Sequence, residues 1–236
     1  MPRVLCVVAA AMLAGCANLP PDLAAVLESA GAPAALSEGD IAQGLKEALA
    51  VGTERAVGRI GVRDGFWLNR DVNIPLPDSL RKVEKTLRTF GQGKVVDDFH
   101  LSLNRAAEAA VPEAAAIFGD AIRTMTLADA RRILDGPPDA ATEYFRGRTQ
   151  VALAARFKPI VSKATASVGA TRKYKDLAAK VSKVSSSFQV QDLDAYVTDK
   201  ALAGLFRTLA GEELRIRQDP AARTTELLQR VFGSKP

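Results

Sequence analysis

The spacing of the apolar residues constrains the fold of this chain more than any other feature of its sequence. From residue 37 onward they recur three or four positions apart, as in Ile41, Leu45 and Leu49, which is the period of a helix with one buried face. An alternating run typical of a short strand occurs at Ser186 to Val190. Aromatic residues make up 6% of the chain, which is low for a β-rich domain. The sequence therefore predicts an all-α fold, a multi-helix, bundle-like domain.

Capping residues and prolines mark the ends of the expected helices. Ser37 with Asp40 and Thr126 with Asp129 have the spacing of capping boxes, and Asp139 stands where another helix needs an N-cap. We expect helices to begin near Ser37, Asp78, Lys94, Pro112, Thr126, Asp139, Arg172, Asp194 and Asp219. Two apolar stripes are expected to be buried, namely Leu80, Val83, Leu87 and Phe90 in one helix and Tyr144, Phe145, Val151, Leu153 and Phe157 in another.

The N-terminal residues have the pattern of a secretory signal. Arg3 provides one positive charge and is followed by ten apolar residues, Val4 to Leu13, which are too few to cross a bilayer as a helix. The run ends in Leu13-Ala14-Gly15-Cys16, which resembles the bacterial lipobox. Such a motif implies cleavage before Cys16 and attachment of acyl chains, such as palmitate, to that residue. The alternative is a plain signal peptide with an incidental cysteine.

Cleavage before Cys16 would divide the chain into a signal peptide at 1–15, a lipidated tether at 16–36 and a helical domain at 37–236. The tether has few charges, and its length allows a reach of at most about 70 Å when it is extended. Because Cys6 is lost with the signal peptide, disulfides, zinc ribbons and cysteine nucleophiles are excluded from the mature chain. No aspartate follows Cys16, which favours the outer membrane, facing the periplasm, in a Gram-negative bacterial envelope.

The scarcity of histidine excludes most familiar catalytic and metal sites. His100 is the only histidine, so neither a zinc site with several histidines nor a di-iron bundle with two Glu-x-x-His pairs can form. The chain has no Gly-x-Ser-x-Gly elbow, and its nearest approach to a phosphate loop, Gly39 to Gly44, lacks the Lys-Ser/Thr that should follow. We therefore expect no metal and no cofactor, with an all-oxygen calcium site left open.

Many short motifs resemble one known family in the same order along the chain. They are Gly44-Leu45-Lys46-Glu47-Ala48-Leu49, Asp64-Gly65-Phe66, Ile74-Pro75-Leu76-Pro77, Asn104-Arg105-Ala106-Ala107-Glu108, Met125-Thr126-x-x-Asp129-Ala130, Ile133-Leu134-x-Gly136, Ala140-Ala141-Thr142-x-Tyr144-Phe145, Ala201-Leu202-x-Gly204-Leu205-Phe206 and Ile216-Arg217-x-x-Pro220 through Val231-Phe232-Gly233. Together they resemble domain of unknown function 4197 over nearly all of 36–233. The resemblance implies a secreted or lipid-anchored bacterial protein, in agreement with the lipobox, and it implies no particular activity.

Polar residues within these motifs form the candidate binding site. Six of them are expected to converge at a helix junction on a bound anionic or polar group, namely Asn104, Arg105, Glu108, Asp129, Tyr144 and Arg217. The alternative for Arg105 and Glu108 is a surface ion pair, since they lie three residues apart on a helix.

Basic residues are concentrated in the basic block, residues 156–183, where eight basic residues and one acidic residue give a net charge of +7. Six members are expected to contact an anionic surface, namely Lys163, Arg172, Lys173, Lys175, Lys180 and Lys183. Acidic lipid headgroups or lipopolysaccharide lie within reach of the tether, whereas nucleic acid is not expected as a partner outside the cytoplasm. The alternative is a solvated helix face.

Two functions are consistent with these features. One is a lipid-anchored, non-catalytic binding or structural protein of the cell envelope, which agrees with the anchor, the tether and the missing catalytic motifs. The other is an envelope hydrolase that uses Glu108 or Asp129 on an arginine-bound substrate. The hydrolase would need a functional carboxylate with a shifted pKa in a deep polar pocket.

Overall fold

The computed structural model describes residues 37–167 and 192–233, and every regular element within these two ranges is helical. The α-helices are α2 (Glu38–Ile60), α3 (Arg81–Thr89), α4 (Gly93–Ala110), α5 (Ala114–Arg123), α6 (Leu127–Asp135), α7 (Ala140–Ser167), α9 (Leu193–Gln218) and α10 (Glu226–Gly233). Single 3₁₀ turns are η1 (Asp78–Leu80), η2 (Val111–Glu113) and η3 (Pro220–Ala222). This confirms the all-α prediction. The strand predicted at Ser186 to Val190 and the helix predicted from Arg172 lie outside the described residues.

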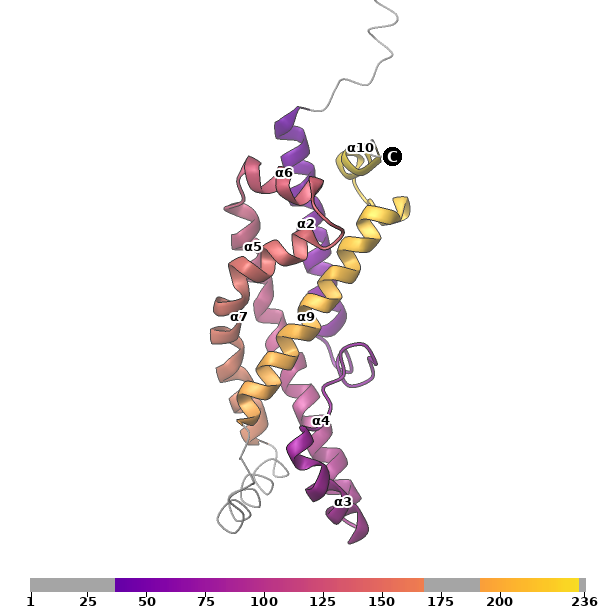
Figure 1. Ribbon diagram of the computed structural model, residues 1–236, viewed down its shortest axis with the longest axis vertical. Helices are drawn as coiled ribbons and strands as arrows, with labels where there is room; N and C mark the ends of the chain where they lie inside the picture. Colours follow the sequence, from indigo (N-terminus) through magenta and orange to yellow (C-terminus); the bar gives the residue numbers. More distant parts are fainter. Residues whose placement is uncertain (1–36, 168–191, 234–236) are drawn as a thin grey trace, which may run out of the picture. The chain divides into compact units, whose positions relative to one another are not determined.

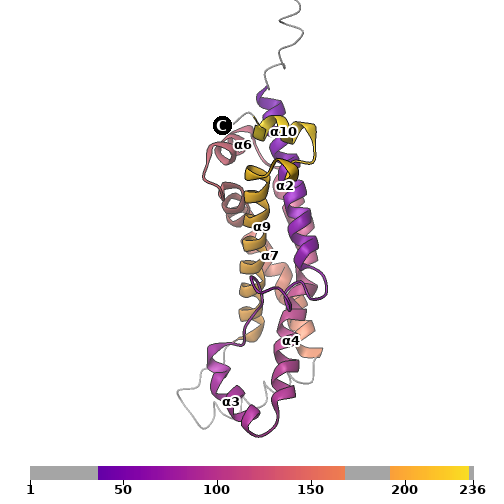
Figure 2. The same ribbon diagram turned by 90° about the vertical axis from the view of Figure 1, so that its right-hand side faces the viewer.

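The core is formed where α9 packs against α2, α4 and α7, while α4 also packs against α7, and α5 packs against α2 and α7 (Figures 1 and 2). Phenylalanines fill much of this core. Phe118 of α5 contacts the ring edges of Phe145 from α7 and Phe206 from α9, with centroid distances of 5.0 and 6.3 Å. All three side chains are fully buried. One aromatic cluster therefore joins α5, α7 and α9.

Both predicted capping boxes are present. The Ser37 hydroxyl accepts from the amide of Asp40 at the start of α2, and Thr126 does the same for Asp129 at the start of α6. The predicted cap at Asp139 is wrong, because the amides that it would bind donate to a carboxylate from α9 instead. A tertiary contact has thus replaced the local cap at the start of α7.

Two residues assigned to buried stripes are exposed. Phe90 is 76% exposed because it ends α3, and Gly91, with φ of 71°, then turns the chain back into α4 at the tip of this helix pair. Val151 is 85% exposed because it lies two residues from the buried Leu153, about 200° around the helix. Leu80, Phe145, Leu153 and Phe157 are buried as predicted.

The segment 61–77 connects α2 to η1 and lies against α4 and α9. Its Phe66 is fully buried and reaches α9 where a glycine, Gly204, leaves room for the ring. A Cβ on Gly204 would lie 2.8 Å from Cε1 of Phe66, closer than packed carbon atoms approach. Asp64, with φ of 68°, supplies the left-handed turn that brings Phe66 inward. In neither described range is there a helix long and apolar enough to cross a membrane.

Candidate functional site

The six predicted site residues fall into three separate groups of hydrogen bonds and ion pairs, not into one cluster. Asn104, Arg105 and Glu108 hold segment 61–77, Asp129 and Tyr144 lie between α6 and α7, and Arg217 joins α9 to the end of α6. The predicted convergence on a single point is therefore wrong. The reason is that each group is taken up by backbone or charges of a different neighbouring element.

Asn104 fixes the proline-containing end of segment 61–77 to α4. Its Oδ1 accepts from the amide of Ile74 at 2.8 Å, and its Nδ2 donates to the carbonyl of the same residue at 3.0 Å. Nε2 of His100, one turn earlier in α4, lies 2.8 Å from that carbonyl oxygen. Asn104 is completely buried. Its side-chain amide satisfies both the N–H and the carbonyl of Ile74, which have no helical or strand partner of their own among these hydrogen bonds.

Glu108 and Arg105 fix the other end of the same segment. Oε1 of Glu108 accepts from the amides of Phe66 and Trp67, both at 3.0 Å. Arg105 donates to Oε2 of Glu108 and to Oδ1 of Asp64, both at 2.6 Å. Burial alone would lower the pKa of Arg105, but these hydrogen bonds outweigh it and raise that pKa above its ordinary value. The ion pair between Arg105 and Glu108 that the alternative predicted is present. It is not a surface pair, however, because Glu108 is buried.

Asp129 is a buried carboxylate that completes the capping box of α6. Its Oδ2 accepts from the Thr126 hydroxyl at 2.8 Å, and Arg132 and Arg148 also pair with it. Tyr144 lies nearby on α7, and Arg148 lies over its ring, 5.6 Å from the centroid. Burial, and then the negative charge of Asp129, raise the pKa of Tyr144 above its ordinary value.

The environment of Asp129 predicts a loss of stability in acid. The Thr126 hydroxyl, and next its backbone amide, hold the pKa of Asp129 below the ordinary value of 3.8. A carboxyl group whose pKa is lower in the folded state stabilises the protein above its unfolded pKa, and this contribution is lost as the pH falls through the folded pKa. We expect the free energy of unfolding to fall below about pH 4, and to fall less steeply in Asp129→Asn. Urea unfolding between about pH 6 and pH 2 measures this, with the exposed Asp120→Asn as control. Parallel curves for wild type and Asp129→Asn would contradict it.

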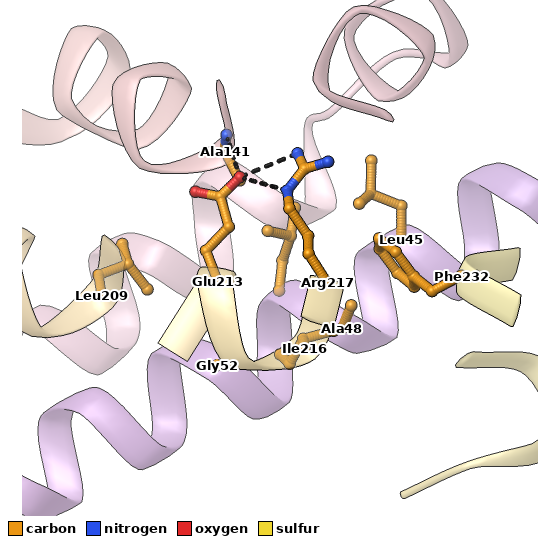
Figure 3. A pocket seen from close by; sticks show the side chains of 10 residues that line it. Leu45, Ala48, Gly52, Ala141, Leu209, Glu213, Ile216, Arg217 and Phe232 are labelled. Carbon is orange, nitrogen blue, oxygen red and sulfur yellow. Dashed lines mark hydrogen bonds and ion pairs between the residues drawn. The ribbon is translucent and has the colours of Figure 1, made fainter. Parts of the chain in front are cut away.

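Arg217 belongs to a junction of three helices that Figure 3 shows from close by. It donates to Oε1 of Glu213 through Nη2 and Nε at 3.0 and 3.1 Å, and to the carbonyl of Ile133 at 2.8 Å. Glu213 accepts from the amides of Ala141 and Thr142, both at 2.9 Å. The carboxylate therefore caps α7, and the guanidinium binds a carbonyl near the C-terminal end of α6.

The cavity beside this junction is small and mostly apolar. It has a volume of about 20 Å³, close to the space that one water molecule needs. Besides Glu213 and Arg217, its lining comes from Leu45, Ala48, Leu49, Gly52, Ala141, Leu209, Ile216 and Phe232 (Figure 3). A substrate does not fit in this space. The junction is suited to holding helix ends together.

Glu213 and its neighbour Glu212 are site residues that the sequence motifs do not include. Both are buried, and Glu212 pairs with Arg215 at 3.1 Å and with Arg59 at 3.7 Å. One signal was present in the sequence, since two adjacent acidic residues beside the apolar stripe of an amphipathic helix need partners if they are buried. The partners themselves come from other helices and cannot be assigned from spacing.

Most of the basic block lies outside the described residues, including Arg172, Lys173, Lys175, Lys180 and Lys183. Lys163 is exposed on α7. Arg156 pairs with Glu113 at 2.7 Å and Lys158 with Asp192 at 3.7 Å. Two positive charges of the block are thus compensated within the fold. Cys16 also lies outside the described residues.

Within 37–167 and 192–233, no group of three or more histidine, cysteine, aspartate or glutamate side chains is arranged to hold a metal ion. The carboxylates of Glu108, Asp129 and Glu213 are all engaged with amides, hydroxyls or arginines of the same chain. The arrangement holds helix ends and segment 61–77 in place.

Comparison with known proteins gives a family and nothing finer. Residues 35–233 match the model of the family described as Protein of unknown function (DUF4197). Neither the curated proteins nor the solved structures include a match to the chain. The matched range includes every helix described above. The chain therefore belongs to the DUF4197 family.

Proposed function

We propose that this protein is a lipid-anchored, non-catalytic helical domain of the bacterial cell envelope, with a binding or structural role at the outer membrane, facing the periplasm. The observation that carries the proposal is Leu13-Ala14-Gly15-Cys16 at the end of the ten-residue apolar run. The described helices begin only after Ser37, about twenty residues beyond that cysteine. Several acyl chains on Cys16 would give durable attachment, since each buried methylene contributes about 0.8 kcal/mol.

The hydrogen bonds of the buried carboxylates favour a non-catalytic role over hydrolase activity. A general acid or base must reach the substrate with an exchangeable proton. Glu108 instead accepts from two amides and from Arg105. Asp129 is held by Thr126 in a form that stays ionised, because its pKa is lowered. These contacts are those of structural carboxylates.

The anionic surface of the membrane is the partner proposed for the basic block. Lys163 is exposed on α7, Lys158 is also exposed but pairs with Asp192, and the remaining lysines of the block follow in the sequence. Each such residue near an acidic lipid or lipopolysaccharide surface contributes about 1 kcal/mol, and salt screens the effect. This contact would add to the acyl anchor and does not replace it.

Cys16→Ala tests the anchor. We expect wild type to incorporate radioactive palmitate in a bacterial host and to fractionate with the membrane, whereas the variant remains unlabelled. The physical reason is that the acyl chains attach to the Cys16 sulfur and to the α-amino group of the same residue, which cleavage exposes. Cys6→Ala is the matched control, because it lies in the apolar run and should leave labelling unchanged. Wild-type protein without label and in the soluble fraction would refute the proposal.

A further inference from the structure

An open groove of about 840 Å³ between α2 and α9 has three arginines around it. Arg55 and Arg59 lie four residues apart on α2 and so share one face of that helix. Arg215 faces them from α9, and Thr224 lines the groove from the link between η3 and α10. Figures 1 and 2 both show α2 and α9 side by side over this length.

A buried carboxylate positions two of these guanidinium groups. Glu212 is 2% exposed, whereas Arg59 and Arg215 are 58% and 55% exposed. Both contacts of Arg215 with Glu212 use Nη1, at 3.1 and 3.2 Å. Within the described residues, the donors on its Nε and Nη2 therefore remain for a ligand, since a guanidinium carries five N–H groups. The buried carboxylate of Glu212 thus fixes the positions of Arg59 and Arg215. The N–H groups of Arg215 that do not contact Glu212 are left for a ligand in the groove.

The third guanidinium has no carboxylate among its described partners. Arg55 donates through Nη1 to the carbonyl of Ala222 at 3.3 Å, which orients the group without neutralising it. Glu54 and Glu212 are the acidic residues that line the groove, against three arginines, so the lining carries a net charge of +1. A singly charged oxyanion would balance this charge and use the planar pairs of donors.

The groove between α3 and α4 provides a useful contrast. It is similar in size, about 760 Å³, and also contains arginines. There, however, Arg81 pairs with Asp78 at 2.8 Å, and Arg88 pairs with Glu84 and Asp97 at 3.0 and 2.7 Å. Those positive charges are compensated locally. Lys85 also lines that groove, so the two grooves differ in their guanidinium groups and not in whether positive charge is in excess: only the groove between α2 and α9 has an arginine, Arg55, without a carboxylate among its described partners.

We propose that Arg55, Arg59 and Arg215 form a binding site for a phosphate-type oxyanion in the groove between α2 and α9. Thr224 provides a hydroxyl at the edge of the same site. The inference rests on the binding role proposed above and names its ligand chemistry, but it does not depend on the lipid anchor. Failure of palmitate labelling would leave it intact, and failure of phosphate binding would leave the anchor intact.

Calorimetric titration of the full-length protein with inorganic phosphate, in non-ionic detergent at constant ionic strength, tests the site. We expect saturable binding of one phosphate per chain. Replacing two guanidinium groups in Arg55→Gln/Arg59→Gln should weaken it at least about tenfold, because charge-assisted hydrogen bonds are lost. Arg70→Gln/Arg123→Gln removes the same charge from other exposed positions and should bind like wild type. No saturable binding, or equal weakening in both double variants, would overturn the proposal.

Glu54→Gln is expected to change phosphate affinity in the opposite direction to the arginine variants, and it removes no group that contacts the phosphate. Glu54 is exposed and lines the groove, so its loss raises the net charge of the site without disturbing the core. We expect phosphate to bind about twofold to fivefold more tightly, in line with Coulomb attraction near a solvated surface. Weaker or unchanged binding in Glu54→Gln would count against the site.

Vesicles distinguish a lipid phosphate from a soluble one. If the ligand is a headgroup, full-length protein should bind phosphatidylglycerol vesicles more tightly than Arg55→Gln/Arg59→Gln does, and free phosphate should compete. If the ligand is a soluble phosphate compound, the two proteins should bind these vesicles equally while only wild type binds free phosphate tightly. Either result supports an oxyanion site.

Discussion

Replacing Glu213 with alanine is expected to lower the free energy of unfolding by about 3–5 kcal/mol. The Glu213 carboxylate accepts from Ala141 and Thr142 at the start of α7 and pairs with Arg217 on its own helix. Its removal leaves two amides of a helix N-terminus without their acceptor, and it leaves a half-buried arginine without its counter-ion. It also removes a negative charge from the positive end of the α7 dipole. Urea unfolding followed by circular dichroism measures the change.

Two variants identify the source of this effect. Glu143→Ala removes another carboxylate from the first turn of α7, but this one is exposed and pairs with Arg146 at the surface. We expect it to change the free energy of unfolding by less than about 1 kcal/mol. Glu213→Gln keeps one acceptor oxygen and should lie between wild type and Glu213→Ala. A Glu213→Ala protein within 1 kcal/mol of Glu143→Ala would show that the cap contributes little.

Local chemistry explains why the sequence predicts the helices well. Ser37 with Asp40 and Thr126 with Asp129 form their capping boxes from residues three apart, so the pattern alone determines the contact. The Arg105–Glu108 pair follows for the same reason. The start of α9 predicted at Asp194 is also within one residue of the observed start at Leu193.

The candidate site could not be predicted in this way, because its contacts join residues that are far apart in the sequence. Glu213 lies 72 residues from Ala141, and Glu108 lies 42 residues from Phe66. Adjacent helical positions also differ by about 100° in direction, so Glu212 and Glu213 reach different partners. The motifs therefore include Glu108 but not Glu213, and the packing of α7, α9 and segment 61–77 decides what each carboxylate binds.

Glu108→Ala is expected to release segment 61–77 from α4 and to lower the free energy of unfolding by about 2–4 kcal/mol. The variant leaves the amides of Phe66 and Trp67 without their shared acceptor and removes one of the two carboxylate partners of Arg105. Trp67 is the only tryptophan of the chain, and its ring lies edge-on against His100 with a centroid distance of 4.9 Å. Its fluorescence therefore reports on this segment alone.

The fluorescence should separate local release from global unfolding. In Glu108→Ala, we expect the Trp67 emission to shift to longer wavelength already in the absence of denaturant, because the segment exposes the indole to water. Circular dichroism should keep a helical spectrum under the same conditions, since the aromatic core formed by Phe118, Phe145 and Phe206 does not depend on Glu108. An unchanged Trp67 spectrum with unchanged stability would show that Glu108 does not hold segment 61–77.

Asp64→Asn is the matched control, because it alters the same network without removing the acceptor of the two amides. Asparagine tolerates the left-handed conformation of Asp64, where φ is 68°, and its side-chain oxygen can still accept from Arg105. Arg105 then keeps Glu108 as its charged partner. We expect Asp64→Asn to lower the free energy of unfolding by less than about 1 kcal/mol and to leave the Trp67 emission unchanged. A large effect of Asp64→Asn would instead mean that the charge of Asp64, and not the Glu108 cap on Phe66 and Trp67, holds the segment.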